Sequence, residues 1–171
     1  MKRIFFPLVA CAIVIAACNE KAISPTASNT IKLPYEAGYT SDFTNNVSDS
    51  NLLLVLNTYK YWEAADLVSM RTTMGDSMSV EGATGFIFNG RTDSLIGIWK
   101  KSRDSLSSVK VMMEVWTKNH SVKDSMDYII TWYKEIDTYS TGRIDSAKYS
   151  DVNGIRNGKM VYYSQYKQAL K

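Results

Sequence analysis

The sequence predicts an α+β domain in which a cone-like, curved antiparallel sheet packs on three N-terminal helices. Residues 52–106 carry apolar side chains mostly at helical spacing, interrupted by two short β-like runs. After residue 108 the apolar side chains alternate instead, which is typical of long strands with one buried face. Helices that come early and strands that come late favour helices gathered on one face of a sheet.

The composition is that of a globular protein. The chain has 171 residues, of which 45% are hydrophobic and 22% charged. These values exclude a wholly disordered chain and a multi-span membrane protein. The length allows one domain with a sizeable core. A net charge of +3 is too small to indicate a nucleic-acid partner.

The N-terminus resembles the signal peptide of a bacterial lipoprotein. Lys2 and Arg3 precede an uncharged apolar run of 14 residues over 4–17, which is shorter than the ~20 residues that a spanning helix needs. The run ends in Ile-Ala-Ala-Cys at residues 15–18, which is similar to a lipobox. The resemblance implies cleavage before Cys18 and a diacylglycerol on its thiol. The alternative is an ordinary signal peptide with an incidental cysteine.

Cleavage at this position would also remove Cys11 and leave Cys18 as the only cysteine. No disulfide and no cysteine-based metal site is then expected. Several acyl chains on one residue give stable membrane anchoring. Asn19 is not the aspartate that commonly retains lipoproteins at the inner membrane, so we expect a lipid-anchored protein of the bacterial cell envelope, at the outer membrane. The sequence leaves open the periplasmic or the surface side.

Three parts are predicted along the chain. Residues 1–17 are the signal peptide, residues 18–44 are the lipidated cysteine and a flexible tether, and residues 45–171 are the folded domain. The tether is rich in Ser, Thr, Asn, Ala and Pro and has no sustained apolar period.

In the first half of the domain, capping residues and helix-ending glycines predict where the helices begin and end. Ser48 to Ser50 provide N-caps for a helix over residues 52–62. A second helix is predicted over 63–74, with Gly75 as its stop. Short strands are predicted at 77–80 and 86–88, followed by a turn at Asn89-Gly90 and a third helix that Thr92 caps.

The second half is read as long strands. They are predicted over residues 108–118, 127–136, 144–155 and 160–166, and residues 156–159 carry a type I′ hairpin signal. In the first of these strands Val111, Met113 and Val115 share one face, and Met112 and Trp116 are predicted on the other. That second face would be a dimer surface, with Met112 and Trp116 in the interface.

Four segments, taken together, resemble the nuclear transport factor 2-like superfamily in its SnoaL-like branch. They are Trp62 to Leu67 at the turn into the second helix, Met74 to Val80 as an acidic residue before a strand, Phe88 to Arg91 before the third helix, and Asn157 to Tyr163 in the last hairpin. The resemblance implies a bent sheet wrapped around three helices, with a pocket at the open end. The superfamily hosts isomerases, dehydratases, cyclases and non-catalytic binders, so the fold alone does not give the function.

Two acids are candidates for a catalytic base. Where the chain resembles ketosteroid isomerase, Glu81 lies five residues after Asp76, which is the offset of that family's carboxylate base. An apolar pocket would raise the pKa of such a group and suit it to proton abstraction. The tyrosine that those isomerases place on the first helix would fall near Leu54, so the partner is missing. The alternative is that Glu81 is a turn acid beside Gly82.

Aromatic residues are candidates for lining a pocket. Trp62, Trp99, Trp132 and Tyr59 could surround a small apolar ligand, and the alternative is core packing. His120, the only histidine, is read as a solvated turn residue, and the alternative is a general base. No metal site is expected, because zinc sites usually take several histidine or cysteine ligands. The sequence has no nucleotide-binding glycine motif and no nucleophile elbow, and we expect no cofactor.

We therefore expect an envelope-anchored lipoprotein whose domain is a non-catalytic small-molecule-binding or protein-interaction module. The alternative is a SnoaL-like enzyme of isomerase, dehydratase or cyclase type that uses a pocket carboxylate as general base. The expected partners are the membrane, through the lipid on Cys18, a small apolar ligand and a second copy of the chain. An enzyme should show a desolvated carboxylate facing a Tyr, Asn or His inside the pocket.

Overall fold

The structure is a computed structural model that describes residues 34–35 and 37–169. From Ala37 onward the chain forms one compact unit. Cys11, Cys18 and the signal peptide lie outside the described residues, as does most of the predicted tether. In the part of the chain that is described, no helix is long and apolar enough to cross a membrane.

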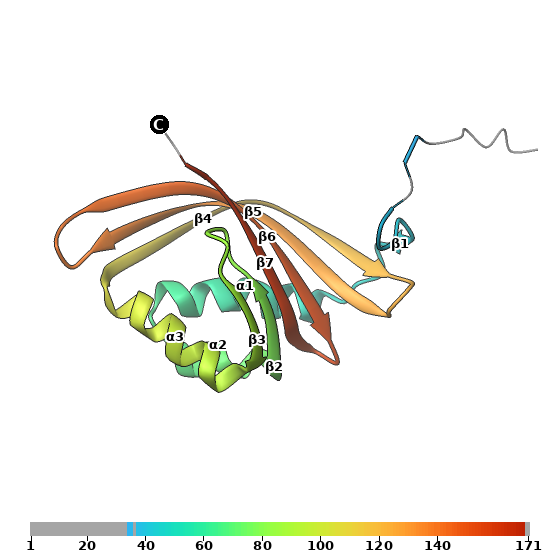
Figure 1. The fold of residues 1–171 in the computed structure, drawn as a ribbon, viewed down its shortest axis with the longest axis horizontal. Coiled ribbons are helices and arrows are strands. Elements are labelled where there is room, and N and C mark those ends of the chain that lie inside the picture. Colours follow the sequence, from blue (N-terminus) through green and yellow to red (C-terminus); the bar gives the residue numbers. More distant parts are fainter. Residues whose placement is uncertain (1–33, 36, 170–171) are drawn as a thin grey trace, which may run out of the picture. The chain divides into compact units, whose positions relative to one another are not determined.

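Seven strands form one curved sheet, and three helices lie against its concave face (Figure 1). The helices are α1 (Asp49–Glu63), α2 (Leu67–Thr72) and α3 (Thr92–Asp104). The strands are β1 (Phe43–Thr44), β2 (Met74–Glu81), β3 (Ile87–Arg91), β4 (Leu106–Ser121), β5 (Met126–Tyr139), β6 (Ile144–Arg156) and β7 (Lys159–Ala169). The α+β prediction, with a curved sheet on three helices, is confirmed.

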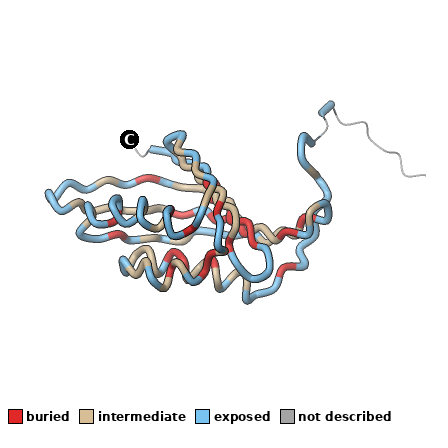
Figure 2. The backbone as a smooth tube through the Cα atoms, turned by 60° about the horizontal axis from the view of Figure 1, so that its bottom comes forward, coloured by how far each residue is buried: buried red, intermediate tan, exposed pale blue. Residues whose placement is uncertain are grey.

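The strand order is β1-β4-β5-β6-β7-β2-β3. Every neighbouring pair is antiparallel except β2 and β7, which run parallel. The core lies between the helices and the sheet, where Val55, Leu95, Ile129, Ile155 and Met160 are at most 1% exposed (Figure 2). Burial of these apolar side chains between the two layers holds the helices on the sheet.

Polar side chains fix where the helices begin and end. The Ser48 hydroxyl caps α1 by accepting from the Asn51 amide at 3.3 Å, as the sequence predicted. The buried guanidinium of Arg103 on α3 donates to the carbonyls of Trp62 and Glu63, at 2.9 Å each. These carbonyls belong to the last turn of α1, so Arg103 caps α1 from a neighbouring helix.

Three predictions in the helical half are wrong. Gly75 does not stop a helix, because α2 already ends at Thr72 and Gly75 lies in β2. Its lack of a side chain lets β2 approach β7, since a Cβ there would lie 3.2 Å from a methyl group of Val161. Asn89-Gly90 is not a turn but part of β3, paired with β2.

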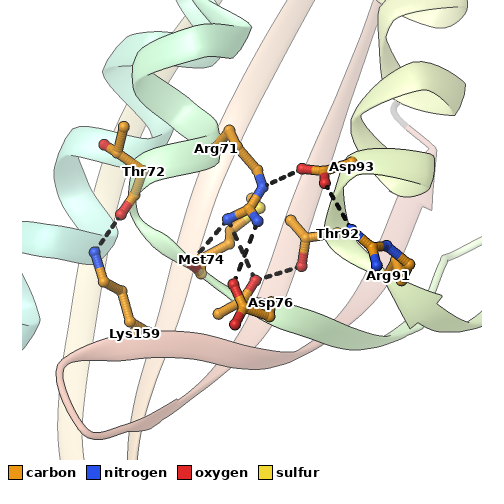
Figure 3. Close-up of polar contacts among 9 residues, drawn as sticks. Arg71, Thr72, Met74, Asp76, Arg91, Thr92, Asp93 and Lys159 are labelled. Atoms are coloured by element: carbon orange, nitrogen blue, oxygen red, sulfur yellow. Dashed lines mark hydrogen bonds and ion pairs between the residues drawn. The ribbon is translucent and has the colours of Figure 1, made fainter.

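Thr92 does not cap α3 either. Arg91 occupies the cap position, and the Thr92 hydroxyl donates instead to the Gly75 carbonyl. Arg71 completes this junction of α2, β2 and α3 (Figure 3). Its guanidinium donates to Asp93 at 2.7 Å and lies 3.6 Å from Asp76.

Strand β4 contains a β-bulge, so the alternation of faces predicted for the whole strand is wrong beyond Met113. Met113 pairs with Tyr133 and Val115 pairs with Trp132, so Glu114 is an extra residue between them. One extra residue exchanges the two faces of a strand from that point onward.

As a result, Met112 and Trp116 lie on opposite faces of the sheet. Trp116 pairs with Thr131, whose side chain is buried on the concave side. Met112 stays on the convex face, where Val115 and Trp132 are its exposed apolar neighbours. A dimer through the convex face stays a prediction, without Trp116 as an interface residue.

Phe43 and Thr44, which the sequence assigned to the tether, form β1 and pair with the end of β4.

The hairpin between β6 and β7 turns at Asn157 and Gly158, which have φ angles of 52° and 67°. These left-handed values fit the predicted type I′ turn between β6 and β7.

Candidate functional site

A cavity of about 420 Å³ lies between the concave face of the sheet and the helices. Its wall combines aromatic rings and methionines with a few polar groups. The residues that matter for its chemistry are Tyr59, Trp99, Tyr133, Glu135, Tyr149 and Tyr163. A site of this volume and polarity suits a small organic molecule.

Of the four aromatic residues predicted to line a pocket, three line the cavity and one does not. Tyr59, Trp62 and Trp99 do line the cavity. Trp132 is not among the lining residues, because the alternation of β5 turns Tyr133 inward and Trp132 outward, where it is 36% exposed. The residue type alone does not indicate which face of the sheet a tryptophan occupies.

A buried carboxylate lies beneath the cavity. Asp151 on β6 has no exposed surface. Its Oδ2 accepts hydrogen bonds from the hydroxyls of Tyr59 and Tyr133 at 2.8 Å and of Tyr163 at 2.9 Å. These tyrosines come from α1, β5 and β7, so one carboxylate oxygen joins a helix to three strands. Such charge-assisted bonds are stronger than neutral ones.

Each of the three hydroxyls also accepts a hydrogen bond. The Gln165 amide donates to Tyr163 at 2.8 Å and to Tyr133 at 3.2 Å. Thr131 lies 2.7 Å from the Tyr59 oxygen and must be the donor, because the Tyr59 proton points to Asp151. Each tyrosine hydroxyl around Oδ2 therefore both donates one hydrogen bond and accepts at least one from a protein group.

The other carboxylate oxygen of Asp151 is different. Oδ1 is buried and has no hydrogen-bond partner among the described residues. Burial raises the pKa of Asp151 to about 6, although the hydrogen bonds from the tyrosines pull it down. A proton taken up by this group would sit on Oδ1, since Oδ2 already accepts three bonds.

Glu135 is the free acid of the cavity wall. It lies on β5, two residues after Tyr133, and faces inward. In the described part of the chain, no donor or cation lies within bonding distance of its carboxyl group. Burial raises the pKa of Glu135 to about 8, the nearby Asp137 and Asp151 carboxylates add to the rise, and Lys167 opposes it. Glu135 is therefore mostly protonated at neutral pH.

The two acids predicted as bases lie outside the cavity, which corrects their assignment. Glu81 is exposed, and the Tyr162 hydroxyl lies 3.4 Å from its carboxylate on the convex face. The Asp76 side chain is fully exposed beside Arg71 (Figure 3). Neither carboxylate can reach a molecule bound between the helices and the sheet.

His120 is not a cavity residue either. The prediction of a solvated turn residue is wrong, because His120 is the last residue but one of β4, pairs with β1 and β5 and is only partly exposed. Its Nδ1 lies 2.7 Å from an Asp127 oxygen. Within the described residues no group of three His, Cys, Asp or Glu side chains could hold a metal ion.

Sequence reasoning missed both acids of the site. The signal was present, because Tyr149, Asp151 and Asn153 alternate along one strand with the spacing of a single face. That face mixes aromatic and polar side chains, which is also the pattern of a partly solvated strand face. Only the pairing with Tyr133 and Tyr163 shows that it is buried.

No protein-family profile matches the sequence, and no curated protein is significantly similar to it. Solved structures do match. An NTF2-like protein of unknown function from Burkholderia pseudomallei has a TM-score of 0.58 at 16% identity, over 71% of this chain and 92% of that one. An LEH-like epoxide hydrolase of M. tuberculosis has a TM-score of 0.60 at 10% identity, over 71% and 84%.

A third structure, IdmH from Streptomyces antibioticus, is described as a candidate polyketide cyclase. It has a TM-score of 0.57 at 12% identity and covers 69% of this chain and 91% of its own. Identities this low show the fold alone. The domain therefore has the nuclear transport factor 2-like fold, as the four sequence segments implied, and the function has to be argued from its own cavity.

The raised pKa of Glu135 makes stability depend on pH. The folded state binds this proton more tightly than the unfolded state, so the stabilisation is complete below pH 4.5 and is lost as the pH rises through about 8. We expect the free energy of unfolding to fall by on the order of 5 kcal/mol over this window. Denaturant titrations at several pH values measure it.

The Glu135→Gln variant should lose the part of this fall between pH 6.5 and 8, which lies above the pKa of about 6 of Asp151. Glu114→Gln, an exposed carboxylate on β4, is the matched control and should behave like the wild type. An identical pH profile in Glu135→Gln and wild type would contradict the assignment.

Proposed function

We propose that this chain is a lipid-anchored envelope protein whose domain binds a small organic molecule in the cavity above Asp151. The observation that carries the proposal is the cavity itself, which stays open at about 420 Å³ although aromatic side chains surround it. A domain that served only as a scaffold would fill this space with side chains, because empty volume in a core is destabilising.

The wall suits a ligand with an apolar body and one polar group. Phe86, Trp99 and Met74 offer apolar surface, and Glu135 offers one unpaired carboxyl group. A few convergent polar groups in an otherwise apolar cleft give a ligand its orientation.

A second candidate, proton-transfer catalysis, is favoured by Glu135 itself. A carboxyl group with a pKa of about 8 holds a proton at neutral pH and can give it to a bound molecule as a general acid. Tyr133 and Tyr149 lie beside it in the wall. Two proteins with the same fold are described as an epoxide hydrolase and a candidate polyketide cyclase, and both descriptions name chemistry on small organic molecules.

A bound molecule recovered from the protein separates the two candidates. If it returns chemically changed after incubation with the wild type but unchanged with Glu135→Gln, the domain is an enzyme. If it returns unchanged from both, Glu135 serves binding only.

The cavity can be blocked from its rim. Ser102 on α3 lines the cavity and is exposed, so Ser102→Phe should place a ring in the opening. We expect native mass spectrometry of the wild-type chain, released from membranes in mild detergent, to show a co-purified small mass that Ser102→Phe lacks.

Ser94→Phe is the matched control, because Ser94 is exposed on the same helix away from the cavity. It should keep the added mass. Equal occupancy in Ser102→Phe and Ser94→Phe, or a wild-type chain without any added mass, would contradict a ligand site in this cavity.

The lipid anchor is tested with the two cysteines. We expect the wild type to incorporate labelled palmitate and to enter the detergent phase on Triton X-114 partitioning, since the acyl chains dominate its membrane affinity. Cys18→Ser should lose both properties. Cys11→Ser, inside the apolar run of the signal, should keep both, and labelling of Cys18→Ser would refute lipidation at this residue.

A further inference from the structure

The charges that act on Glu135 are mostly acidic. They are Glu63 from α1, Asp137 from β5 and Asp151 from β6, against Lys167 from β7. Two of these acids have a cation of their own, since Lys60 pairs with Glu63 at 2.6 Å and Arg103 acts on Asp137. On β4 the residue paired with Glu135 is the aliphatic Val111. A ligand that brings a positive charge to Glu135 would favour its ionised form, which the neighbouring acids disfavour.

The hydrogen-bond donors at the inner end of the cavity are already used. The hydroxyls of Tyr59, Tyr133 and Tyr163 donate to Asp151. The Gln165 amide donates to two of these hydroxyls. An anionic ligand would need free donors, and Lys167 is the one cationic side chain among the described residues that line the cavity.

The aromatic wall already accommodates an ammonium group. The Lys167 Nζ lies 5.5 Å from the centroid of the Tyr149 ring. Tyr149 in turn stacks on Tyr133, with centroids 5.4 Å apart and an interplanar angle of 19°. The negative faces of such rings attract cations, and the attraction is stronger where water is excluded.

We propose that the cavity binds an organic ammonium ion carried on an apolar or aromatic body, with its charge seated against the Glu135 carboxylate and the tyrosine rings. The proposal rests on the small-molecule site proposed above and names its ligand class. Because the cation needs Glu135 ionised, binding releases a proton and strengthens as the pH rises towards 8.

Three probes of one shape and different charge test this class. They are 2-phenylethylamine, 2-phenylethanol and phenylacetate, titrated into the full-length protein in mild detergent and followed by isothermal calorimetry. At pH 8 we expect the amine to bind about tenfold or more tightly than the alcohol, and the carboxylate to bind weakest. The affinity for the amine should fall by more than tenfold between pH 8 and pH 6.

Glu135→Gln should remove the preference for the amine while keeping the affinity for the alcohol, which excludes loss of folding as the cause. Glu114→Gln should retain the preference. Equal binding of amine and alcohol would overturn the proposal. Tightest binding of phenylacetate would overturn it too, and its loss in Lys167→Gln would identify Lys167 as the anchor.

The test also separates this proposal from the one on which it rests. If none of the three probes binds but the Ser102→Phe-sensitive mass is present, the ammonium assignment fails and the small-molecule site stands. If that mass is missing as well, both fail.

Discussion

The arrangement of this domain depends on one buried carboxylate. Asp151 has no exposed surface, and an ion in such a place is strongly destabilising unless it is hydrogen-bonded. Three tyrosine hydroxyls on one oxygen meet that need, and they come from α1, β5 and β7. Helix α1 is thus tied to the sheet by a polar contact whose geometry is narrower than that of apolar packing.

The same contact explains why a cavity exists. The hydroxyl of each tyrosine is hydrogen-bonded to Asp151 on the sheet, which fixes the orientation of its ring. The ring therefore lines the cavity and cannot rotate into it. Tyr133 is further held between Tyr59, at a centroid distance of 5.0 Å, and Tyr149, at 5.4 Å. Trp99 packs edge-on against Tyr163 from the helix side. Because these rings are held both by their hydroxyl groups and by neighbouring rings, they cannot move to fill the space between the helices and the sheet, and the cavity stays open.

Much of the fold was predictable from the sequence, because it depends on local periodicity. The first helix, the long strands and the turn at Asn157-Gly158 follow from apolar spacing and turn chemistry. The errors came where tertiary contact overrides local signals. Gly75 is a glycine for close approach of two strands rather than a helix stop, and the bulge at Glu114 moves Trp116 to the concave face. Neither effect is visible before the strand pairing is known.

The site was harder to predict than the fold. The aromatic lining by Tyr59, Trp62 and Trp99 was predicted, because large rings on helices face a core. The acids were not, since Asp151 and Glu135 are ordinary polar residues in their own strands and acquire their properties from neighbours that are distant in sequence. Their burial and the three converging hydroxyls exist only in the folded sheet.

The most direct measurement is the titration of the Asp151 carboxyl carbon by NMR in wild type and in Tyr163→Phe, with Tyr166→Phe as the control on the exposed convex face. The account predicts a pKa of about 6 in the wild type, a higher pKa in Tyr163→Phe because a bond to the ionised form is lost, and no change in the control. An Asp151 that titrates like an exposed aspartate, or that does not respond to Tyr163→Phe, would contradict the account.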